Sequence, residues 1–156
     1  MMFQPRKILT PTDFSNHAER AFDMALSIAS RYQARVFLLH VINNSIQQYA
    51  GDYGIDKNTM ERVMSEIIVF VNEKLKETLL LDHDPRQIKV IQEVRHGKPS
   101  EEIIKETCER KIDLLVMASH GKTSMNHFLM GSVTERVIQE VKCPVLLMRS
   151  HLRKEA

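Results

Sequence analysis

The residues best suited to chemistry lie in a loop in the last third of the chain. The loop follows an apolar run at residues 112–117 and carries Gly121 and Gly131, with Ser132 directly after the second glycine. Ser132 and Glu135 have the spacing of a capping box, which predicts that a helix begins here. A glycine loop between a buried strand and a helix N-terminus presents backbone N–H groups and the positive end of a helix dipole. The pattern therefore predicts a phosphate-binding site.

Two other phosphate motifs do not fit this loop. The tripeptide Gly-Lys-Thr at residues 121–123 resembles the end of a P-loop, but that motif also needs a glycine at position 116, where the chain has Val116. A dinucleotide-binding fold would place G-x-G-x-x-G after the first strand, and that motif is absent there. We therefore expect neither a Walker-type nucleotidase nor a dinucleotide-binding enzyme.

Catalytic and metal-binding patterns are weaker. The densest group of possible metal ligands, Asp-His-Asp at residues 82–84, has no partner at a diagnostic spacing, so a solvated turn is the better interpretation. His40 lies inside an apolar run, where a buried and hydrogen-bonded histidine is the usual case. Asp13 and Asp113 lie near predicted strand ends, but they have no nucleophile and base at a recognisable spacing. We predict no catalytic residues and no metal site.

Length and composition indicate one ordinary globular domain. The chain has 156 residues, of which 43% are hydrophobic and 27% charged. No apolar stretch approaches the ~20 residues of a membrane span, and the first residues lack the apolar core of a signal peptide, so we expect a cytoplasmic protein without a membrane segment. The net charge of +2 does not suggest nucleic-acid binding. Cys108 and Cys143 lie in apolar patterns, which predicts two reduced, packed thiols.

The elements that must position the glycine loop follow from the hydrophobic pattern. Near-continuous apolar runs predict buried strands at residues 36–42 and 112–117, and apolar runs at residues 7–11 and 143–148 predict a short first strand and the last strand. A less regular run at residues 88–94 predicts a further strand, nearer an edge of the sheet. Apolar residues spaced by threes and fours predict a helix in each of the four intervals between these strands. Strict alternation predicts a single-domain α/β fold with a five-stranded, mainly parallel sheet and helices on both faces.

Three local signals refine this outline. Asn58 and Glu61 have the spacing of a second capping box, and Pro99 suits the first position of a helix whose buried stripe would include Cys108. Residues 43–57 show no regular pattern, and an irregular segment of that length predicts a flexible lid or a partner-facing loop.

The glycine spacing and several shorter motifs are shared with a known family. Gly121 and Gly131 have nine residues between them, Ser132 follows, and Ala118 stands three positions before Gly121. This pattern resembles the G-x-x-G-x9-G-[ST] motif after the fourth strand in ATP-binding members of the universal stress protein family, with alanine at the first position. The resemblance extends over nearly the whole chain, through the segments KIL, PTDFS, LHV, G-x-P, GSVTERV and CPVL.

The resemblance implies a Rossmann-like, adenine-nucleotide-binding domain at residues 1–150 and a polar tail at 151–156. ATP, with or without Mg²⁺, would lie across the carboxyl ends of the first and fourth strands. Asp13 would anchor adenosine, the backbone of Val41 would contact it, and the phosphates would lie on N–H groups of the glycine loop and the following helix. The residues that the resemblance implies for the site are Pro11, Thr12, Asp13, Val41, Met117, Ala118, His120, Gly121, Gly131, Ser132, Val133 and Thr134.

The resemblance also implies a homodimer in which the last strand, from Val145 to Met148, pairs with its counterpart. Such pairing is physically reasonable because an apolar edge strand is otherwise an aggregation liability. We therefore predict a dimeric ATP-binding stress or signalling module that presents its nucleotide state to a protein partner, with little or no turnover. Two alternatives stay open. One is a slow ATPase or self-phosphorylating enzyme that uses Ser124 or Ser132, and the other is a scaffold dimer that binds no nucleotide.

Overall fold

A computed structural model of the chain describes residues 2–80, 88–122 and 129–149. Its strands are β1 (Lys7–Pro11), β2 (Arg35–Asn43), β3 (Val90–Gly97), β4 (Leu114–Ala118) and β5 (Val145–Met148). Its helices are α1 (Asn16–Tyr32), α2 (Ser45–Asp52), α3 (Lys57–Leu80), α4 (Pro99–Glu109) and α5 (Ser132–Glu140). The candidate metal ligands at 82–84, the tail at 151–156 and Ser124 lie outside the described residues.

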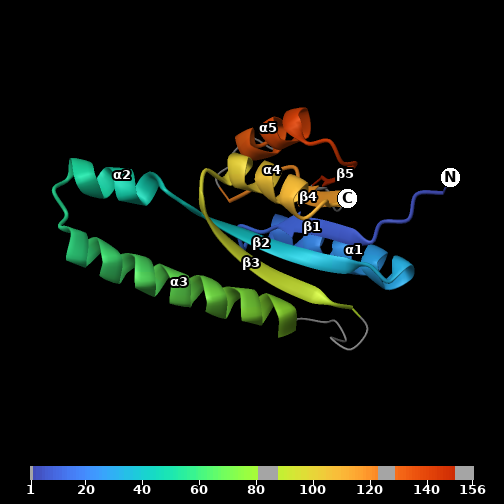
Figure 1. Cartoon of the computed structure of the whole chain (residues 1–156), viewed down its shortest axis with the longest axis horizontal. Coiled ribbons are helices and arrows are strands. Elements are labelled where there is room, and N and C mark those ends of the chain that lie inside the picture. Colours follow the sequence, from blue (N-terminus) through green and yellow to red (C-terminus); the bar gives the residue numbers. More distant parts are fainter. Residues whose placement is uncertain (1, 81–87, 123–128, 150–156) are drawn as a thin grey trace, which may run out of the picture.

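The strands form one sheet in the order β3-β2-β1-β4-β5, and every neighbouring pair is parallel. Helices α1 and α3 cover one face of the sheet, while α4 and α5 cover the other (Figure 1). The predicted α/β fold is therefore confirmed, together with its parallel sheet and the position of β3 at an edge. The order of the strands puts the carboxyl ends of β1, β2 and β4 side by side.

Two apolar layers hold the sheet between its helices. Ile8 and Leu38 belong to the layer that contains α1, whereas Leu9 and Leu39 belong to the layer that contains α4 and α5. This division follows from the strand geometry, because successive side chains point to opposite faces. The buried residues of α1 include four alanines, which lets the helix lie close to the sheet.

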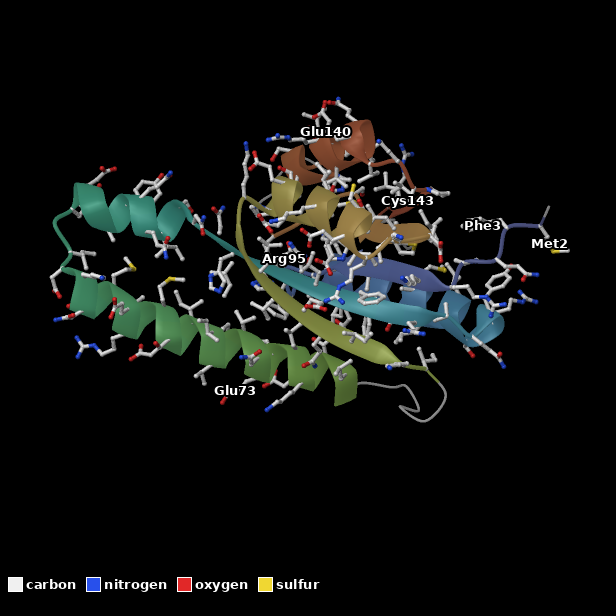
Figure 2. All side chains as sticks on the ribbon, viewed as in Figure 1. Met2, Phe3, Glu73, Arg95, Glu140 and Cys143 are labelled. Carbon is white, nitrogen blue, oxygen red and sulfur yellow. The ribbon has the colours of Figure 1, made fainter. Side chains whose placement is uncertain are left out.

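Charged residues cover the outer surfaces of the helices. Figure 2 shows Glu73 of α3 and Glu140 of α5 pointing away from the sheet on opposite sides of the molecule. The longest helix, α3, has Val71 and Leu75 as its fully buried side chains, both in its C-terminal half. Over the described residues, no helix combines the length and the apolar composition that a membrane crossing requires.

The expectation of an irregular segment at 43–57 is wrong for residues 45–52, which form α2. This helix begins after Asn43, whose side-chain oxygen accepts a hydrogen bond from the Ser45 N–H at 3.0 Å. Only Ala50 of α2 is buried, so the helix carries no apolar stripe that periodicity could detect. A role of residues 43–57 as a lid or partner-facing segment stays a prediction.

The predicted cap of α3 is also wrong, because Asp56 occupies that position rather than Asn58. The Asp56 carboxylate accepts hydrogen bonds from the Thr59 N–H at 3.0 Å and the Thr59 hydroxyl at 2.6 Å. Aspartate is as good a capping residue as asparagine, so an acceptable cap two positions earlier begins the helix.

Helix α4 begins at Pro99, as predicted, but its buried side differs from the expected one. Cys108 is exposed, so its predicted burial is wrong, while Cys143 is partly buried. Glu106 and Thr107 are buried instead. The rotation of α4 is therefore set by a charged side chain that the apolar pattern did not include.

Candidate functional site

The residues predicted for the site all line one cavity of about 510 Å³. The cavity lies at the carboxyl ends of β1, β2 and β4, between the first turns of α4 and α5. Its lining comprises Pro11, Thr12, Asp13, Ala18, Leu39, His40, Val41, Pro99, Ile103, Met117, Ala118, His120, Gly121, Leu129, Met130, Gly131, Ser132, Val133 and Thr134. An open parallel sheet binds ligands at this edge, because loops from several strands meet there.

The sequence-based prediction did not include the residues that α4 contributes. Pro99 follows β3 by two positions, so the carboxyl-end rule could have placed it at this edge of the sheet. The sequence does not reveal that Ile103 lies at the cavity, because its apolar side chain fits an ordinary buried position on the helix. It lines the cavity beside Val41 and Met117, which together with Leu39 make this end of the cavity apolar.

The turn after β1 is held by its own side chains. The Thr12 hydroxyl oxygen accepts a hydrogen bond from the Phe14 N–H at 3.0 Å, and Asp13 Oδ1 accepts one from the Ser15 N–H at 3.0 Å. Ser15 then caps α1 by accepting a helix N–H at 3.2 Å. Phe14 adopts a φ of 62°, which is uncommon for a bulky residue and indicates that these bonds constrain the turn. The turn thus fixes the position of Asp13 at the cavity.

The second oxygen of the Asp13 carboxylate crosses to the glycine loop. Oδ2 accepts a hydrogen bond from the Lys122 N–H at 2.9 Å. A Cβ atom at Gly121 would lie only 2.6 Å from the same oxygen. Glycine is therefore required at position 121 because a side chain has no space there; its φ is not in the left-handed region.

The second motif glycine, Gly131, caps α5. Its N–H donates to the Ser119 carbonyl at 2.8 Å, and a Cβ atom on it would lie 3.4 Å from that carbonyl oxygen. The predicted capping box is wrong, because Ser132 is the first helical residue and the cap carries no side chain. The first N–H groups of α5 therefore have no capping side-chain acceptor in the described chain, and Ser132, Val133 and Thr134 line the cavity.

This end of the cavity fits a phosphate group. Uncapped N–H groups at a helix N-terminus attract an anion, and the helix dipole adds to that attraction. Gly121 and Gly131 allow the loop to pack closely, because a Cβ atom at Gly121 would meet Asp13 and one at Gly131 would meet the backbone of residues 119–121. The fit follows from backbone groups, so it does not depend on a nearby cationic side chain.

Ala118 ends β4 at the first motif position. Its φ lies outside the left-handed region, so the backbone there does not require glycine. Its carbonyl accepts a hydrogen bond from the Thr134 hydroxyl at 3.0 Å, which ties the end of β4 to the first turn of α5. The alanine at this position is therefore compatible with the geometry of the loop.

His40 links β2 to the Asp13 turn. Its Nδ1 lies 2.8 Å from the Thr12 carbonyl oxygen, which can only accept, so Nδ1 carries the proton. Its ring stacks on Phe14 with the centroids 4.5 Å apart. Burial lowers the pKa of His40 below its ordinary value, although the bond to Thr12 and the nearby Asp13 carboxylate oppose that shift. His40 is thus hydrogen-bonded, as the sequence predicted, but it is half-buried and lines the cavity rather than lying in the core.

Two basic side chains lie near the glycine loop. His120 lines the cavity, and its Nδ1 is 2.8 Å from the hydroxyl of Ser119, which is buried and outside the lining. This contact orients the His120 ring without offering a nucleophile to the cavity. The ammonium group of Lys122 lies 5.9 Å from the centroid of the Phe14 ring, beside the Asp13 turn.

Comparisons with known proteins agree with this fold and motif. The sequence profile described as the universal stress protein family matches residues 5–149. Universal stress protein MJ0577 from Methanocaldococcus jannaschii is 33% identical, over 92% of this chain and 94% of that protein. Its solved structure has a TM-score of 0.66 at 31% identity and covers 97% of this chain and 99% of that one.

Two further structures share the fold. Universal stress protein UspA from Lactobacillus plantarum has a TM-score of 0.72 at 26% identity, covering 92% of this chain and 97% of that chain. A universal stress protein solved in complex with cAMP has a TM-score of 0.62 at 21% identity, covering 94% of this chain and 98% of that chain. The family profile spans nearly the whole sequence, and relatives match over most of their own length. The chain therefore belongs to the universal stress protein family.

Proposed function

We propose that this universal stress protein binds ATP in the cavity between α4 and α5. The observation that carries the proposal is the N-terminus of α5, which is capped by Gly131 and therefore leaves its first N–H groups for an anion. The triphosphate would lie on the N–H groups of Ser132, Val133 and Thr134. The base would lie at the apolar end of the cavity, and Asp13 would anchor the ribose.

The fold adds support from outside this chain. A universal stress protein of the same fold was solved with cAMP, an adenine nucleotide. At 21% identity that likeness concerns the fold, so the argument for this chain rests on its own glycines, helix cap and cavity. Mg²⁺, if it accompanies ATP, would be held by the phosphates and water, because Mg²⁺ dehydrates reluctantly and usually binds through substrate phosphates.

A thermal melt with and without ATP and Mg²⁺ tests the proposal, with Mg²⁺ alone and GTP as controls. A ligand at ~100 times its dissociation constant stabilises by ~2.7 kcal/mol, and each kcal/mol moves the Tm of a chain of this size by roughly 2–4 °C. We expect a rise of several degrees with ATP that is absent in Gly131→Val. An unchanged Tm at millimolar ATP would reject nucleotide binding and favour a scaffold dimer.

Binding without rapid turnover is the second part of the proposal. Both oxygens of Asp13 accept backbone N–H groups, so the carboxylate is held as an anchor rather than kept free as a general base. Ser132 is the first residue of a helix, not a side chain paired with a base. Incubation with γ-labelled ATP should leave the nucleotide intact and the protein unlabelled. Product formation above the level of Asp13→Ala would instead establish an enzyme.

We further propose that β5 pairs with β5 of a second copy. β5 is an edge strand, and each of its four residues is only half-buried. The carbonyls of Pro144 and Met148 accept from β4, so the backbone groups of Val145 and Leu147 point to the open edge. A second strand at this edge would provide hydrogen-bond partners for the backbone groups of β5 and would bury its apolar side chains.

Light scattering after size exclusion tests the dimer. Leu147→Pro removes one outward N–H donor without removing a hydrogen bond to β4, so we expect a folded monomer. Leu146 faces β4 with its backbone, and a conservative Leu146→Val change serves as the control that stays dimeric. A dimeric Leu147→Pro variant, or a monomeric native chain, would contradict this interface. A protein partner would recognise whether the dimer has nucleotide bound.

A further inference from the structure

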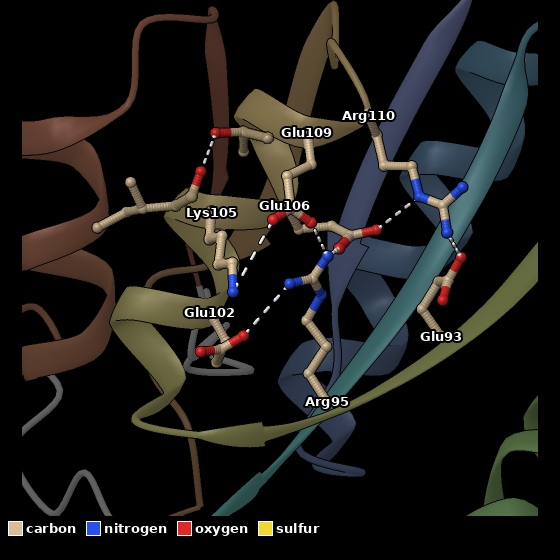
Figure 3. A network of polar contacts seen from close by, with 9 residues as sticks. Glu93, Arg95, Glu102, Lys105, Glu106, Glu109 and Arg110 are labelled. Carbon is tan, nitrogen blue, oxygen red and sulfur yellow. Dashed lines mark hydrogen bonds and ion pairs between the residues drawn. The ribbon is translucent and has the colours of Figure 1, made fainter.

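An ion-pair network joins β3 to α4 on the face of the sheet that carries the cavity (Figure 3). Arg95 of β3 contacts Glu102, Glu106 and Glu109, which follow one side of α4. The Arg95 side chain is 19% exposed and that of Glu106 is completely buried. Because a buried charge is costly without its partner, this arrangement fixes the position of α4 against β3.

The network continues at the C-terminal end of α4. Arg110 donates from Nε to Glu106 at 3.1 Å and pairs with Glu93, which lies two residues before Arg95 on β3. The Arg110 guanidinium also lies 5.5 Å from the centroid of the Phe37 ring on β2. Both ends of the helix are therefore attached to the same edge of the sheet.

The N-terminal end of the network adjoins the cavity. Arg95 is the register partner of Val41, a lining residue on β2. Glu102 is on the same turn of α4 as Pro99 and directly precedes Ile103, and both of these residues line the cavity. A change at the Arg95–Glu102 contact, where Nη1 and Oε2 are 3.3 Å apart, would therefore move the apolar wall of the cavity.

Gly97 shows that the position of Glu102 is closely constrained. Gly97 ends β3 with a φ of 151°, and a Cβ atom on it would lie 2.8 Å from Cγ of Glu102. The Glu102 side chain thus lies directly over the end of β3 on its way to Arg95. The first turn of α4 therefore lies close to the end of β3, and the Arg95–Glu102 ion pair connects the two.

We propose that the Arg95–Glu102 ion pair positions Pro99 and Ile103 against the nucleoside and so sets the affinity for base and ribose. The inference rests on the proposed function, which places a nucleoside at the apolar end of the cavity. The phosphates would lie on α5 and the glycine loop. Helix α5 meets the first turn of α4 through the exposed Arg136–Glu101 ion pair, which includes neither Arg95 nor Glu102. Loss of the Arg95–Glu102 ion pair should therefore weaken the binding of adenosine, ADP and ATP by the same factor.

The test compares Glu102→Gln with Glu109→Gln as a matched control. Each change removes one carboxylate partner of Arg95 from α4, but Glu109 lies on the last turn, away from the lining residues. Arg95 is left intact, because its removal would leave the buried Glu106 carboxylate with Arg110 but without Arg95 and could prevent folding. Dissociation constants for adenosine, ADP and ATP are measured by calorimetry, alongside the Tm of each variant.

We expect Glu102→Gln to weaken the binding of all three ligands by roughly tenfold, as the loss of a charge-assisted contact can do. Glu109→Gln should bind them with nearly the native affinity. The two variants should have similar Tm values, because each loses one partner of the same arginine. A purely structural role would instead lower the Tm and leave adenosine affinity in Glu102→Gln equal to that in Glu109→Gln.

The outcomes separate this inference from the proposed function. If the native chain binds neither ATP nor adenosine, the proposed function is wrong and the inference fails with it. If the native chain binds both and Glu102→Gln binds them as tightly as Glu109→Gln does, only the inference is wrong. Weaker ATP binding with unchanged adenosine binding would also overturn it, because the ion pair would then act on the phosphate end.

Discussion

The carboxylate of Asp13 accepts a hydrogen bond from the Lys122 N–H at 2.9 Å, although the two residues are 109 positions apart in the sequence. The bond joins the turn after β1 to the glycine loop after β4. It forms because β1 and β4 are neighbours in the sheet, so that their carboxyl ends meet. The first and second halves of the chain thus share one site.

Gly121→Ala should weaken ATP binding through Asp13. The new methyl group would lie 2.6 Å from Asp13 Oδ2, so the turn and the glycine loop would have to separate. We expect the loss to be smaller when the same change is made in Asp13→Ala, because the clashing carboxylate is then absent. A double-mutant cycle measured by calorimetry checks this, since contacting residues typically couple by ~0.5–3 kcal/mol. Additive effects would show that the two loops act independently.

Gly131→Val and Gly131→Ala should differ in nucleotide binding but not in folding. The φ of Gly131 is −62°, which any residue adopts, and an added Cβ would lie 3.4 Å from the Ser119 carbonyl oxygen. Alanine should therefore fit and keep measurable ATP affinity, whereas the branched valine would enter the space proposed for phosphate. Circular dichroism checks folding and calorimetry checks binding. Native affinity in the valine variant would mean that the phosphates lie elsewhere.

Stability should fall in mild acid because of His40. Burial is the main reason that the pKa of His40 is lowered in the folded protein. As the pH falls below its unfolded pKa of ~6.5, the unfolded chain takes up the proton more readily than the folded chain. The contribution of neutral His40 is therefore present above that pKa and is lost as the pH falls through the lowered value.

Urea denaturation between pH 8 and pH 5 measures this dependence in the native chain and in His40→Asn. Asparagine keeps a donor for the Thr12 carbonyl but does not titrate. The free energy of unfolding should decline less steeply toward acid in the variant. Parallel profiles for the two proteins would assign the pH dependence to other groups.

The two thiols should react at different rates. Cys108 is exposed, whereas Cys143 is partly buried and burial raises the pKa of its thiol. Because the thiolate is the reactive form, a disulfide reagent at pH 7.5 should modify Cys108 first. Cys108→Ser should abolish the fast phase seen by absorbance, and Cys143→Ser should retain it. A fast phase that survives in Cys108→Ser would contradict this order.

The apolar pattern predicted most of the scaffold. Strands β1, β2 and β4 are central and largely buried, so they are nearly continuous apolar runs, and the edge strand β5 is apolar as well; the positions of all four required no tertiary information. The site residues followed from the glycine spacing and from the family resemblance. The structure brings them into one cavity because loops after parallel strands meet at one edge of the sheet.

Features that rest on a choice among local signals were not determined by the sequence. Asn58 and Ser132 were both acceptable caps, yet Asp56 and Gly131 occupy those positions. Helix α2 has one buried residue, so no periodicity marked it. The free-energy differences between alternative local signals are smaller than the free energies of tertiary contacts. The packing of the folded chain therefore decides which signal is used.

The sequence by itself determined the α/β fold and the alternation of its strands with helices α1, α3, α4 and α5, because apolar periodicity encodes burial directly. The glycine spacing indicated which loop approaches the turn after β1 closely. Only the tertiary structure decided the rotation of α4. Glu106 is buried because Arg95, on a different element, lies opposite it. An ion pair depends on which elements become neighbours, and two charges distant in sequence carry no periodic signal that would reveal their pairing.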